Sequence, residues 1–328
     1  MTTPREDLAA AVGRLRAAKR ALFTCHARPD GDAIGSQLAL AELAESFGVA
    51  VEIVNRDPAP SQYAELPGIE RISVGESLPP DFPGDFDLVV ALECTDPERS
   101  GLDGLTALPM VNIDHHRANQ LYGEVNAVDV EAPAVGEMVW HLFGIAGVKP
   151  SRDAATNAFV ALSTDTGDFS YSNATERAFL AAAEMVAAGA IPEQVSQWVH
   201  NSRSEASVRL SGEALATLDL SCNGRIATVC VDPAAFRRAG ATPADTEGLI
   251  DLPRSIAGVE ATALLKMWEP GTIRVSLRSS GEVDVRRVAA TLGGGGHTNA
   301  AGCTLQGDLA TARSRIVELL VDLLEGRA

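Results

Sequence analysis

The sequence has few aromatic residues, a shortage of cationic residues and no long uninterrupted apolar run. Lysine and arginine total 27 against 44 acidic residues, which leaves a net charge of −17. A protein that holds long nucleic acid through many phosphate contacts is usually basic, so a long duplex is not an expected partner. A small phosphorylated ligand, held by metal ions and a few arginines, is compatible with this charge.

The apolar content indicates globular domains and argues against a membrane protein. Hydrophobic residues make up 46% of the 328 positions, which is enough for the cores of two ordinary domains. The most apolar stretch, AFLAAAEMVAAGAI, is too short and too alanine-rich to cross a bilayer, and Glu184 interrupts it. The opening residues, MTTPREDLAA, do not resemble a secretory signal. A membrane is therefore not an expected partner.

Cysteine is also scarce. The chain has five cysteines, an odd number, and none of them forms a CxxC pair. Scattered reduced thiols are typical of cytoplasmic proteins, so a cytoplasmic location is expected.

The first part of the chain alternates between apolar runs and segments of helical periodicity, such as residues 33–48 and 134–147. Continuous apolar runs that end in polar residues are typical of buried parallel strands. Strands are predicted at residues 20–27, 50–56, 86–96 and 108–116. This alternation predicts an α/β fold with a doubly wound, mainly parallel sheet.

The composition changes at residues 188–215, which are polar, serine-rich and helical in pattern. We interpret them as a helical linker between a first domain, residues 1–187, and a second domain, residues 216–328. The second domain is predicted to be smaller and α+β, because strand-like runs at 224–232, 259–269 and 271–280 precede an amphipathic helix at the chain's end.

Polar side chains gather where the strands of the first domain are predicted to end. Each cluster alone is more often a turn or a helix cap. Ligands bind beyond the carboxyl ends of the strands in an open α/β sheet, so four such clusters are expected to converge at one edge. Carboxylates and imidazoles without thiolates suit Mn²⁺ or Mg²⁺ better than structural zinc. The clusters are His26, Asp30 and Asp32; Glu93, Thr95 and Asp96; Asp114, His115 and His116; and Asp165, Thr166 and Gly167.

A glycine tract follows a short predicted helix, residues 283–292. One interpretation is a helix C-cap and flexible connector. The other is a phosphate cradle, in which backbone N–H groups and His297 donate to the anion. The candidate residues of this cradle are Gly294, Gly295, Gly296 and His297.

The strand-like run TIRVSLRSS alternates apolar residues with Arg274, Ser276 and Arg278. One face of this strand is therefore predicted to be apolar and the other cationic. Arg278 and Ser279 are expected to contact the same phosphate as the glycine tract.

These motifs resemble those of a known family. HARPDGDAIGS, ALECTD, NIDHH and STDTGDF are similar to the successive motifs of the DHH phosphoesterases, and LRSS and GGGGHTNAAG resemble the associated DHHA1 domain. The resemblance covers nearly the whole chain, and it is strongest to the bifunctional oligoribonucleases and pAp phosphatases, the nanoRNases. DHH followed by GGGH is a specific signal, whereas either motif alone is not.

The resemblance implies a role for each motif residue. Two Mn²⁺ ions are the implied cofactor, with Mg²⁺ as the alternative. His116 is similar to the histidine that faces the reacting phosphate, and Asp114 would support its neighbours. Glu93 would bridge both ions, although the family usually has the shorter aspartate there. The other implied metal ligands are His26 and Asp30 for one ion, and Asp32, His115 and Asp165 for the second.

The implied reaction is metal-dependent hydrolysis of very short oligoribonucleotides to nucleoside monophosphates, with 3′-phosphoadenosine 5′-phosphate (pAp) as a second substrate. The partners would be short single-stranded oligoribonucleotides, pAp or linear dinucleotides, and a homodimer is one option for the assembly. Two alternatives stay open. One is a manganese inorganic pyrophosphatase, and the other is a nucleotide-binding regulator that Glu93 has weakened as an enzyme.

Overall fold

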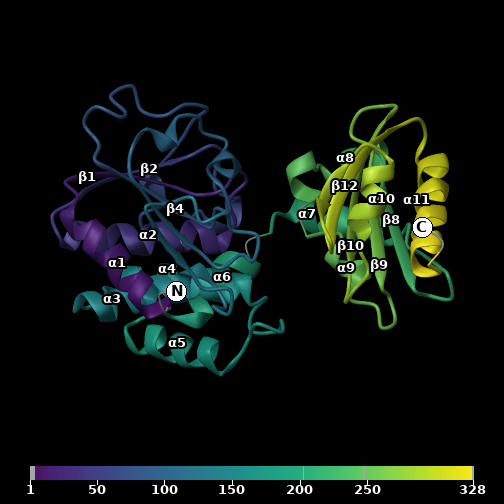
Figure 1. Ribbon diagram of the computed structural model, residues 1–328. Helices are drawn as coiled ribbons and strands as arrows, with labels where there is room; N and C mark the ends of the chain where they lie inside the picture. The colour runs from purple at the N-terminus through teal and green to yellow at the C-terminus, as the bar shows by residue number, and fades with distance from the viewer. Residues whose placement is uncertain (1–3, 202, 247, 327–328) are drawn as a thin grey trace. The chain divides into compact units, whose positions relative to one another are not determined.

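The computed structural model describes residues 4–201, 203–246 and 248–326, and the chain divides into two compact domains between residues 202 and 203 (Figure 1). The first domain contains β1 (Arg20–Thr24), α2 (Gly31–Ser46), β2 (Ala50–Asn55), β3 (Ile72–Val74), β4 (Leu88–Leu92), β5 (Met110–Asp114) and β6 (Val125–Val128). It also contains helices α1 (Pro4–Ala17), α3 (Val135–Ala146), α4 (Arg152–Asp165), α5 (Glu176–Ala187) and α6 (Pro192–His200).

The six strands of the first domain form one parallel sheet in the order β3-β2-β1-β4-β5-β6. This is a doubly wound order, and it confirms the predicted fold class. The order reverses between β1 and β4, so the loops after these two strands flank the switch point at which such sheets bind ligands. Ala21, Leu22 and Phe23 pair with the fully buried residues of β4, as expected for a central strand.

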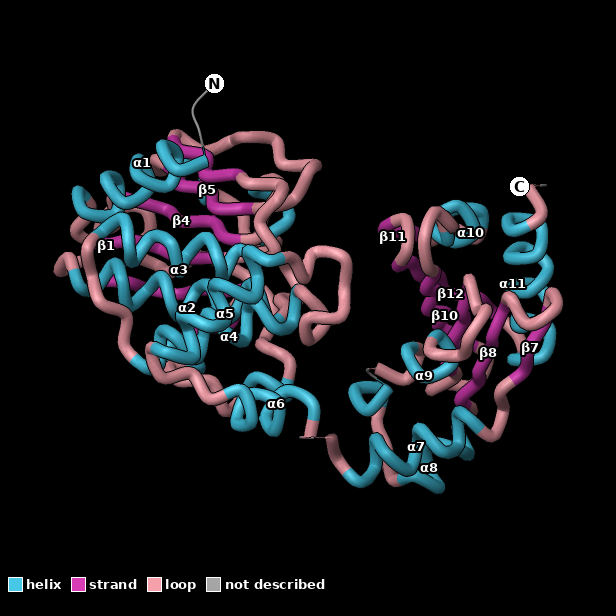
Figure 2. The backbone as a smooth tube through the Cα atoms, turned by 90° about the horizontal axis from the view of Figure 1, so that it is seen from below, coloured by secondary structure: helices cyan, strands magenta, loops and turns pink. Residues whose placement is uncertain are grey.

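The two faces of this sheet are covered differently. Helices α1, α2 and α3 pack against the strands on one face, while α4 packs against α2 and α3, and α5 against α3 and α4. All five share a core with residues such as Phe23, Val90 and Ile113, and Figure 2 shows these helices in front of the strands. The other face is covered by loops and by the short 3₁₀ turns Pro97–Ser100 and Leu105–Ala107. The crossover from β4 to β5 therefore uses turns in place of an α-helix.

Helices α2, α3 and α4 approach one another closely because glycines face neighbouring helices. A Cβ atom on Gly35 would lie 2.3 Å from the Asn157 carbonyl oxygen, and one on Gly136 would lie 2.3 Å from the Ala161 Cβ. Both distances are shorter than real contacts, so side chains at these positions would separate the helices that carry the first domain's polar loops.

This packing gives a prediction with a control in the same helix. Gly136→Ala is expected to destabilise the first domain by ~1–3 kcal/mol through overpacking. Gly144 also lies in α3, but nothing is within 4 Å of a Cβ there. Gly144→Ala is therefore expected to stabilise the domain by about 0.5–1 kcal/mol, through helix propensity alone. Urea midpoints test the pair, and shifts of the same sign would contradict the packing argument.

The second domain contains helices α7 (Glu205–Leu215), α8 (Pro233–Ala239), α9 (Asp251–Arg254), α10 (Val285–Thr291) and α11 (Leu309–Leu324). Its strands are β7 (Asp219–Ser221), β8 (Ile226–Val231), β9 (Ala261–Lys266), β10 (Thr272–Ser279), β11 (Gly295–His297) and β12 (Ala300–Gln306). They form one mixed sheet in the order β11-β12-β10-β9-β8-β7, with α10 and α11 on one face and α7 to α9 on the other. The predicted α+β class is confirmed.

The segment predicted as a linker, residues 188–215, contains two helices. Helix α6 packs against α4 of the first domain, and α7 packs against α8 of the second. The division of the chain falls between these helices, so each of them belongs to a domain. None of the helices in the described ranges is long and apolar enough to cross a bilayer.

Candidate metal centre

The loop after β1 brings three predicted ligands to the start of α2. Asp30 caps this helix, because its Oδ1 accepts a hydrogen bond from the Ala33 N–H at 3.0 Å. His26 Nδ1 lies 3.0 Å from the Ala27 carbonyl oxygen, which can only accept, so Nδ1 carries the proton. The other ring nitrogen, Nε2, lies 3.8 Å from Asp30 Oδ2 and is free to bind a cation.

Asp32 connects this loop to the start of another helix. Its carboxylate accepts hydrogen bonds from the backbone N–H groups of Val135 and Gly136, at 2.7 and 2.8 Å, and from the Ser36 hydroxyl at 2.9 Å. Val135 and Gly136 open α3, and the residue before them, Ala134, has no side chain that could cap the helix. Asp32 therefore caps α3 from a distance of more than a hundred residues in the chain.

Glu93 occupies an unusual position directly after β4. Its φ is +56°, a left-handed conformation that is strained for a residue with a long side chain. The residue is only 3% exposed. Its Oε1 lies 3.3 Å from His115 Nε2, yet among the described residues it accepts no hydrogen bond. A buried carboxylate oxygen without a donor is costly unless a cation binds it.

The DHH segment, residues 114–116, begins at the last residue of β5 and is held by its own aspartate. Asp114 is fully buried, and its Oδ1 accepts hydrogen bonds from the N–H groups of His115 and His116 and from His116 Nδ1 at 2.8 Å. His115 Nδ1 donates to the Ala132 carbonyl oxygen at 2.9 Å. Both histidines thus have their Nδ1 atoms occupied and their Nε2 atoms free. This arrangement of a histidine anchored through one ring nitrogen is usual for metal ligands.

Asp165 requires a correction. Its cluster is predicted to lie at the end of a strand, but Asp165 is the last residue of helix α4. The Ser151 hydroxyl caps that helix, and the alanine-rich segment after it forms regular helix. The end of α4 nevertheless brings the carboxylate to the same site, with Oδ2 3.6 Å from His115 Nε2.

The predicted ligands therefore come together in space, as three overlapping groups. Within each group the ligand atoms lie within 4.8 Å of one another. Glu93 and His115 are each shared by two groups, which joins all three into one centre. The groups are His26, Asp30 and Glu93; Asp32, His115 and Asp165; and Glu93, His115 and His116.

The charges of this centre are not balanced by the protein. Burial raises the pKa of Asp32, and burial together with the charge of Asp32 raises the pKa of Glu93 well above its usual value. Burial and the charge of Asp32 also raise the pKa of Asp165, to about 7. Carboxylates held together in this way repel one another, and a divalent cation removes that repulsion. The donor set and the unsatisfied Oε1 of Glu93 therefore fit Mn²⁺ or Mg²⁺.

These pKa shifts predict how the stability of metal-free protein depends on pH. Asp165 has a pKa of about 7 in the folded protein, against about 3.9 in an unfolded chain. A group whose pKa is raised by folding stabilises the folded protein at pH values below its pKa in the unfolded chain. This contribution disappears as the pH rises through the group's pKa in the folded protein. The pKa values of His26 and His115 are also raised despite burial, by Asp30 and Asp32 respectively, and act in the same direction.

Stability in a chelator is therefore expected to fall between about pH 4 and pH 7. Urea midpoints measured across this range test the expectation. Asp165→Asn should flatten the curve, because asparagine does not titrate. A wild-type urea midpoint that increases with pH over this range would contradict the raised pKa of Asp165.

Several residues that support the centre were not found from the sequence. Asn119 Nδ2 donates to Asp114 Oδ2 at 2.5 Å. Arg177 forms two hydrogen bonds with the fully buried Glu137 and one with Asp129, which fixes the segment between β6 and α3 that carries the Ala132 carbonyl. Arg177 and its partners are 40 or more residues apart in the chain, so no local pattern indicates them. The two neighbouring thiols, Cys25 and Cys94, are buried and belong to none of the three groups.

The predicted phosphate-binding residues of the second domain have different environments. Arg278 lies on the more exposed face of β10 and donates from Nη1 to the Leu277 carbonyl at 3.1 Å. Ser279 is 4% exposed, donates to the Val283 carbonyl and accepts from Asn299, so a phosphate would have to replace these bonds.

The glycine tract combines a helix end with an edge strand. The N–H groups of Gly293 and Gly294 donate to carbonyls of α10, as in the C-cap interpretation. Gly295 and Gly296 belong to β11, which pairs with β12. A Cβ on Gly294 would lie 2.1 Å from the Gly302 carbonyl oxygen, so this glycine is required for the close approach of the two segments. The side chain of His297 lies outside the described part of the structure.

Comparisons with known proteins match both domains, in the same order along the chain. Residues 20–162 match the DHH family, N-terminal domain, and residues 223–326 match the DHHA1 domain. A bifunctional oligoribonuclease and PAP phosphatase NrnA from Thermus thermophilus is 33% identical over 299 residues, which are 89% of this chain and 86% of that protein. The protein of the same name from Bacillus subtilis is 27% identical and covers 85% of this chain and 87% of its own.

Solved structures give the same fold. An exopolyphosphatase-related protein from Bacteroides fragilis superimposes with a TM-score of 0.87 at 23% identity, covering 97% of this chain and 96% of that one. RecJ from Thermus thermophilus, solved in complex with Mn²⁺, has a TM-score of 0.53 at 14% identity and covers 96% of this chain and 55% of its own. With both domains matched in order and a relative of 33% identity along most of its length, this chain belongs to the DHH–DHHA1 family of phosphoesterases.

Proposed function

We propose that this protein hydrolyses short oligoribonucleotides to nucleoside monophosphates and removes the 3′-phosphate of pAp, using two Mn²⁺ ions. The observation that carries the proposal is the centre of three overlapping carboxylate and imidazole groups, joined by Glu93 and His115. The relatives named as bifunctional oligoribonuclease and PAP phosphatase support the choice of substrates. The five unpaired thiols support a cytoplasmic site of action.

The proposal divides the metal ligands between two ions. His26 and Asp30 would hold one ion, Asp32, His115 and Asp165 would hold the other, and Glu93 would contact both. The chemistry that divalent cations supply in such a site is the activation of water near neutral pH and the neutralisation of charge on phosphate oxygens. The three histidines present Nε2 because their Nδ1 atoms are bound to fixed acceptors.

His116 is the residue best suited to contact the phosphate. Its side chain is 41% exposed, whereas that of His115 is 14% exposed. The hydrogen bond from Nδ1 to Asp114 fixes the ring, so Nε2 can donate a hydrogen bond to a phosphate oxygen or a proton to the departing oxygen. Asp114 itself is fully buried and acts by orienting His116.

In the second domain, we propose that Arg278 binds the terminal phosphate of the substrate. Replacing it with alanine is expected to weaken binding of substrates that carry this phosphate by roughly 1.5–3 kcal/mol, the value of a charge-assisted hydrogen bond. Substrates without the phosphate should lose much less. Arg286→Ala is the control, because this exposed arginine already pairs with Asp284. Equal losses for both substrate types would mean that Arg278 is structural.

One assay tests the function as a whole. Purified protein with Mn²⁺ is offered a 5′-phosphorylated dinucleotide, pAp and pyrophosphate in parallel. Turnover of the first two is expected. Turnover of pyrophosphate alone would instead establish the pyrophosphatase alternative, and the absence of any turnover with nucleotide binding retained would favour the regulator.

A further inference from the structure

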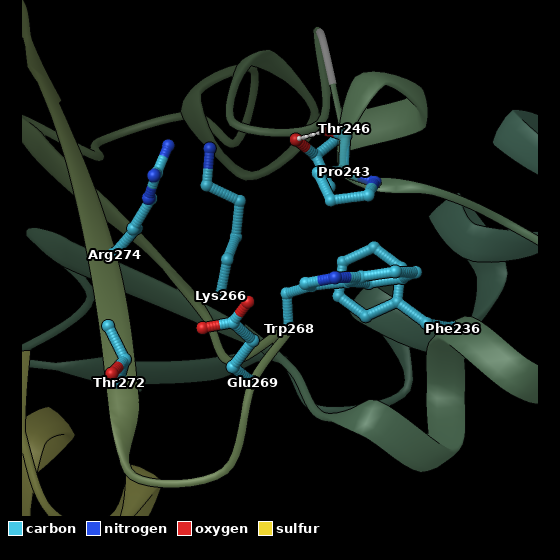
Figure 3. A pocket seen from close by; sticks show the side chains of 8 residues that line it. All are labelled: Phe236, Pro243, Thr246, Lys266, Trp268, Glu269, Thr272 and Arg274. Carbon is cyan, nitrogen blue, oxygen red and sulfur yellow. Dashed lines mark hydrogen bonds between the residues drawn. The ribbon is translucent and has the colours of Figure 1, made fainter.

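The second domain contains a pocket of about 280 Å³ that the proposed chemistry does not use. Figure 3 shows the Trp268 ring against the ring of Phe236, with Lys266 and Arg274 extending side by side from the neighbouring strands. The remaining lining residues are Pro243, Thr246, Glu269 and Thr272. The volume is near the lower limit of pockets that hold small ligands, which start at about 300 Å³.

The cations of the pocket continue the exposed face of β10. Arg278 follows Arg274 by four positions, an even number, so both side chains lie on the same face of this strand. Lys266 is the partner of Arg274 in the antiparallel pairing of β9 and β10, so it shares that face. The two arginines are four steps apart along the strand, which corresponds to about 13 Å. The three cations thus form a row with the aromatic pair at one end.

No carboxylate forms an ion pair with this row among the residues that the structure describes. The backbones of Lys266 and Arg274 pair within the sheet, but their side chains have no ion-pair or hydrogen-bond partner there. Burial lowers the pKa of Lys266, and the charges of Arg274 and Arg278 lower it further. A carboxylate close to the ammonium group would raise this pKa. Glu269 also lines the pocket, but in the described part of the chain it forms no ion pair with Lys266 or Arg274. Adjacent unpaired cations in a chain with a net charge of −17 indicate a site for an anion.

The aromatic pair indicates what else the ligand contains. Trp268 is 45% exposed, a large open area for an indole ring. Its position is fixed by the buried Phe236, whose ring centroid lies 4.8 Å away at an interplanar angle of 89°. A fixed and open aromatic ring beside a cationic row is the arrangement by which proteins bind single-stranded nucleic acid, with bases stacked on the ring and phosphates on the cations.

We propose that this pocket binds one nucleotide of a single-stranded oligoribonucleotide, with its base stacked on Trp268 and its phosphate held by Lys266 and Arg274. The choice of ligand rests on the proposed function. A chain of several nucleotides covers the distance from Arg278 to the pocket, whereas pAp, with a single nucleoside, does not. The pocket therefore contributes to the binding of longer substrates only.

The test compares a 5′-phosphorylated pentanucleotide with pAp, using full-length protein and Mn²⁺. Trp268→Ala is expected to raise KM for the pentanucleotide about tenfold, within the range for a lost base stack, and to leave kcat and the kinetics on pAp unchanged. Trp268→Phe should retain most of the affinity, because phenylalanine also stacks. Lys266→Gln should reduce the slope of log kcat/KM against log salt concentration by about 0.7, the value for one phosphate contact on a single strand.

Arg315→Gln is the matched control for charge. Arg315 is exposed on α11, which covers the opposite face of the sheet, and it pairs with Glu318. This variant should leave both the KM and the salt slope of the pentanucleotide unchanged. An equal increase of KM for pAp and for the pentanucleotide in Trp268→Ala would overturn the proposal. No change of KM for either substrate would also overturn it.

A binding measurement separates this proposal from the proposed function. Fluorescence anisotropy of a labelled pentanucleotide is recorded in a chelator, where hydrolysis does not proceed. Binding that Trp268→Ala weakens supports the pocket even if the wild-type protein hydrolyses nothing. Binding that Trp268→Ala leaves unchanged overturns the pocket even if hydrolysis is observed.

Discussion

Asp165→Ala is expected to abolish hydrolysis without destabilising the metal-free protein, whereas Asp32→Ala is expected to remove both activity and stability. Each aspartate is a proposed ligand of the same ion, so each loss should lower kcat/KM by at least about a hundredfold, as for any several-kcal/mol contribution. The structural contexts differ. Within the described ranges, the Asp165 carboxylate accepts one long hydrogen bond, from Asn173 at 3.5 Å, and lies 3.6 Å from His115 Nε2. Burial and the charge of Asp32 raise its pKa, so a charged Asp165 is unfavourable in the metal-free protein.

Asp32, in contrast, holds the start of α3. Its removal leaves the N–H groups of Val135 and Gly136 without an acceptor, at about 1–3 kcal/mol for each buried donor that stays unsatisfied. Urea midpoints in a chelator, together with kcat/KM in Mn²⁺, measure the two effects separately. Wild-type-like turnover by either variant would refute the two-metal proposal. Equal stability of the two variants would refute the capping role of Asp32.

The second large effect concerns Glu93, where charge and length can be varied independently. Glu93→Gln keeps the size of the side chain but replaces the anion by an amide, whose single neutral oxygen is a poor bridge between two cations. A loss of at least about a hundredfold in kcat/KM is expected. In the absence of metal the same variant should be at least as stable as the wild type, because it removes a buried and repelled charge.

Glu93→Asp keeps the charge and should retain or increase activity. The residue has a φ of +56°, and aspartate tolerates this left-handed conformation better than glutamate does. The aspartate that the family pattern has at this position is therefore compatible with the local backbone. Kinetic constants and metal content by elemental analysis are compared for the three proteins.

A different pattern would support the regulator alternative. If Glu93 does not bridge, Glu93→Gln would change little, and Glu93→Asp would create activity from a low baseline. A wild-type protein that holds at most one metal ion and gains a second in Glu93→Asp would show that the chain is a weakened enzyme.

The sequence alone determined which local structures form around the centre. Asp30 precedes a segment of helical periodicity and caps it, as its side-chain oxygen and position predict. Apolar runs that end at Glu93 and Asp114 predicted buried parallel strands, because such runs are short and continuous. The alternation on β10 predicted that its arginines share one face. These features depend on neighbours within a few residues, so a single sequence contains the information.

The tertiary structure decided which distant groups meet. Asp165 lies at the end of a helix and not of a strand, because the alanine-rich segment before it favours helix, and only the packing of α4 brings it to His115. The N–H groups that hold Asp32 belong to backbone more than a hundred residues away, where no side-chain pattern marks them. The pocket at Trp268 likewise depends on strand register, which pairs Arg274 with Lys266, and on α8, which brings Phe236 under the indole. Local preferences specify elements, but contacts between elements follow from the packing of the whole domain, and those contacts set the burial and charge on which the chemistry depends.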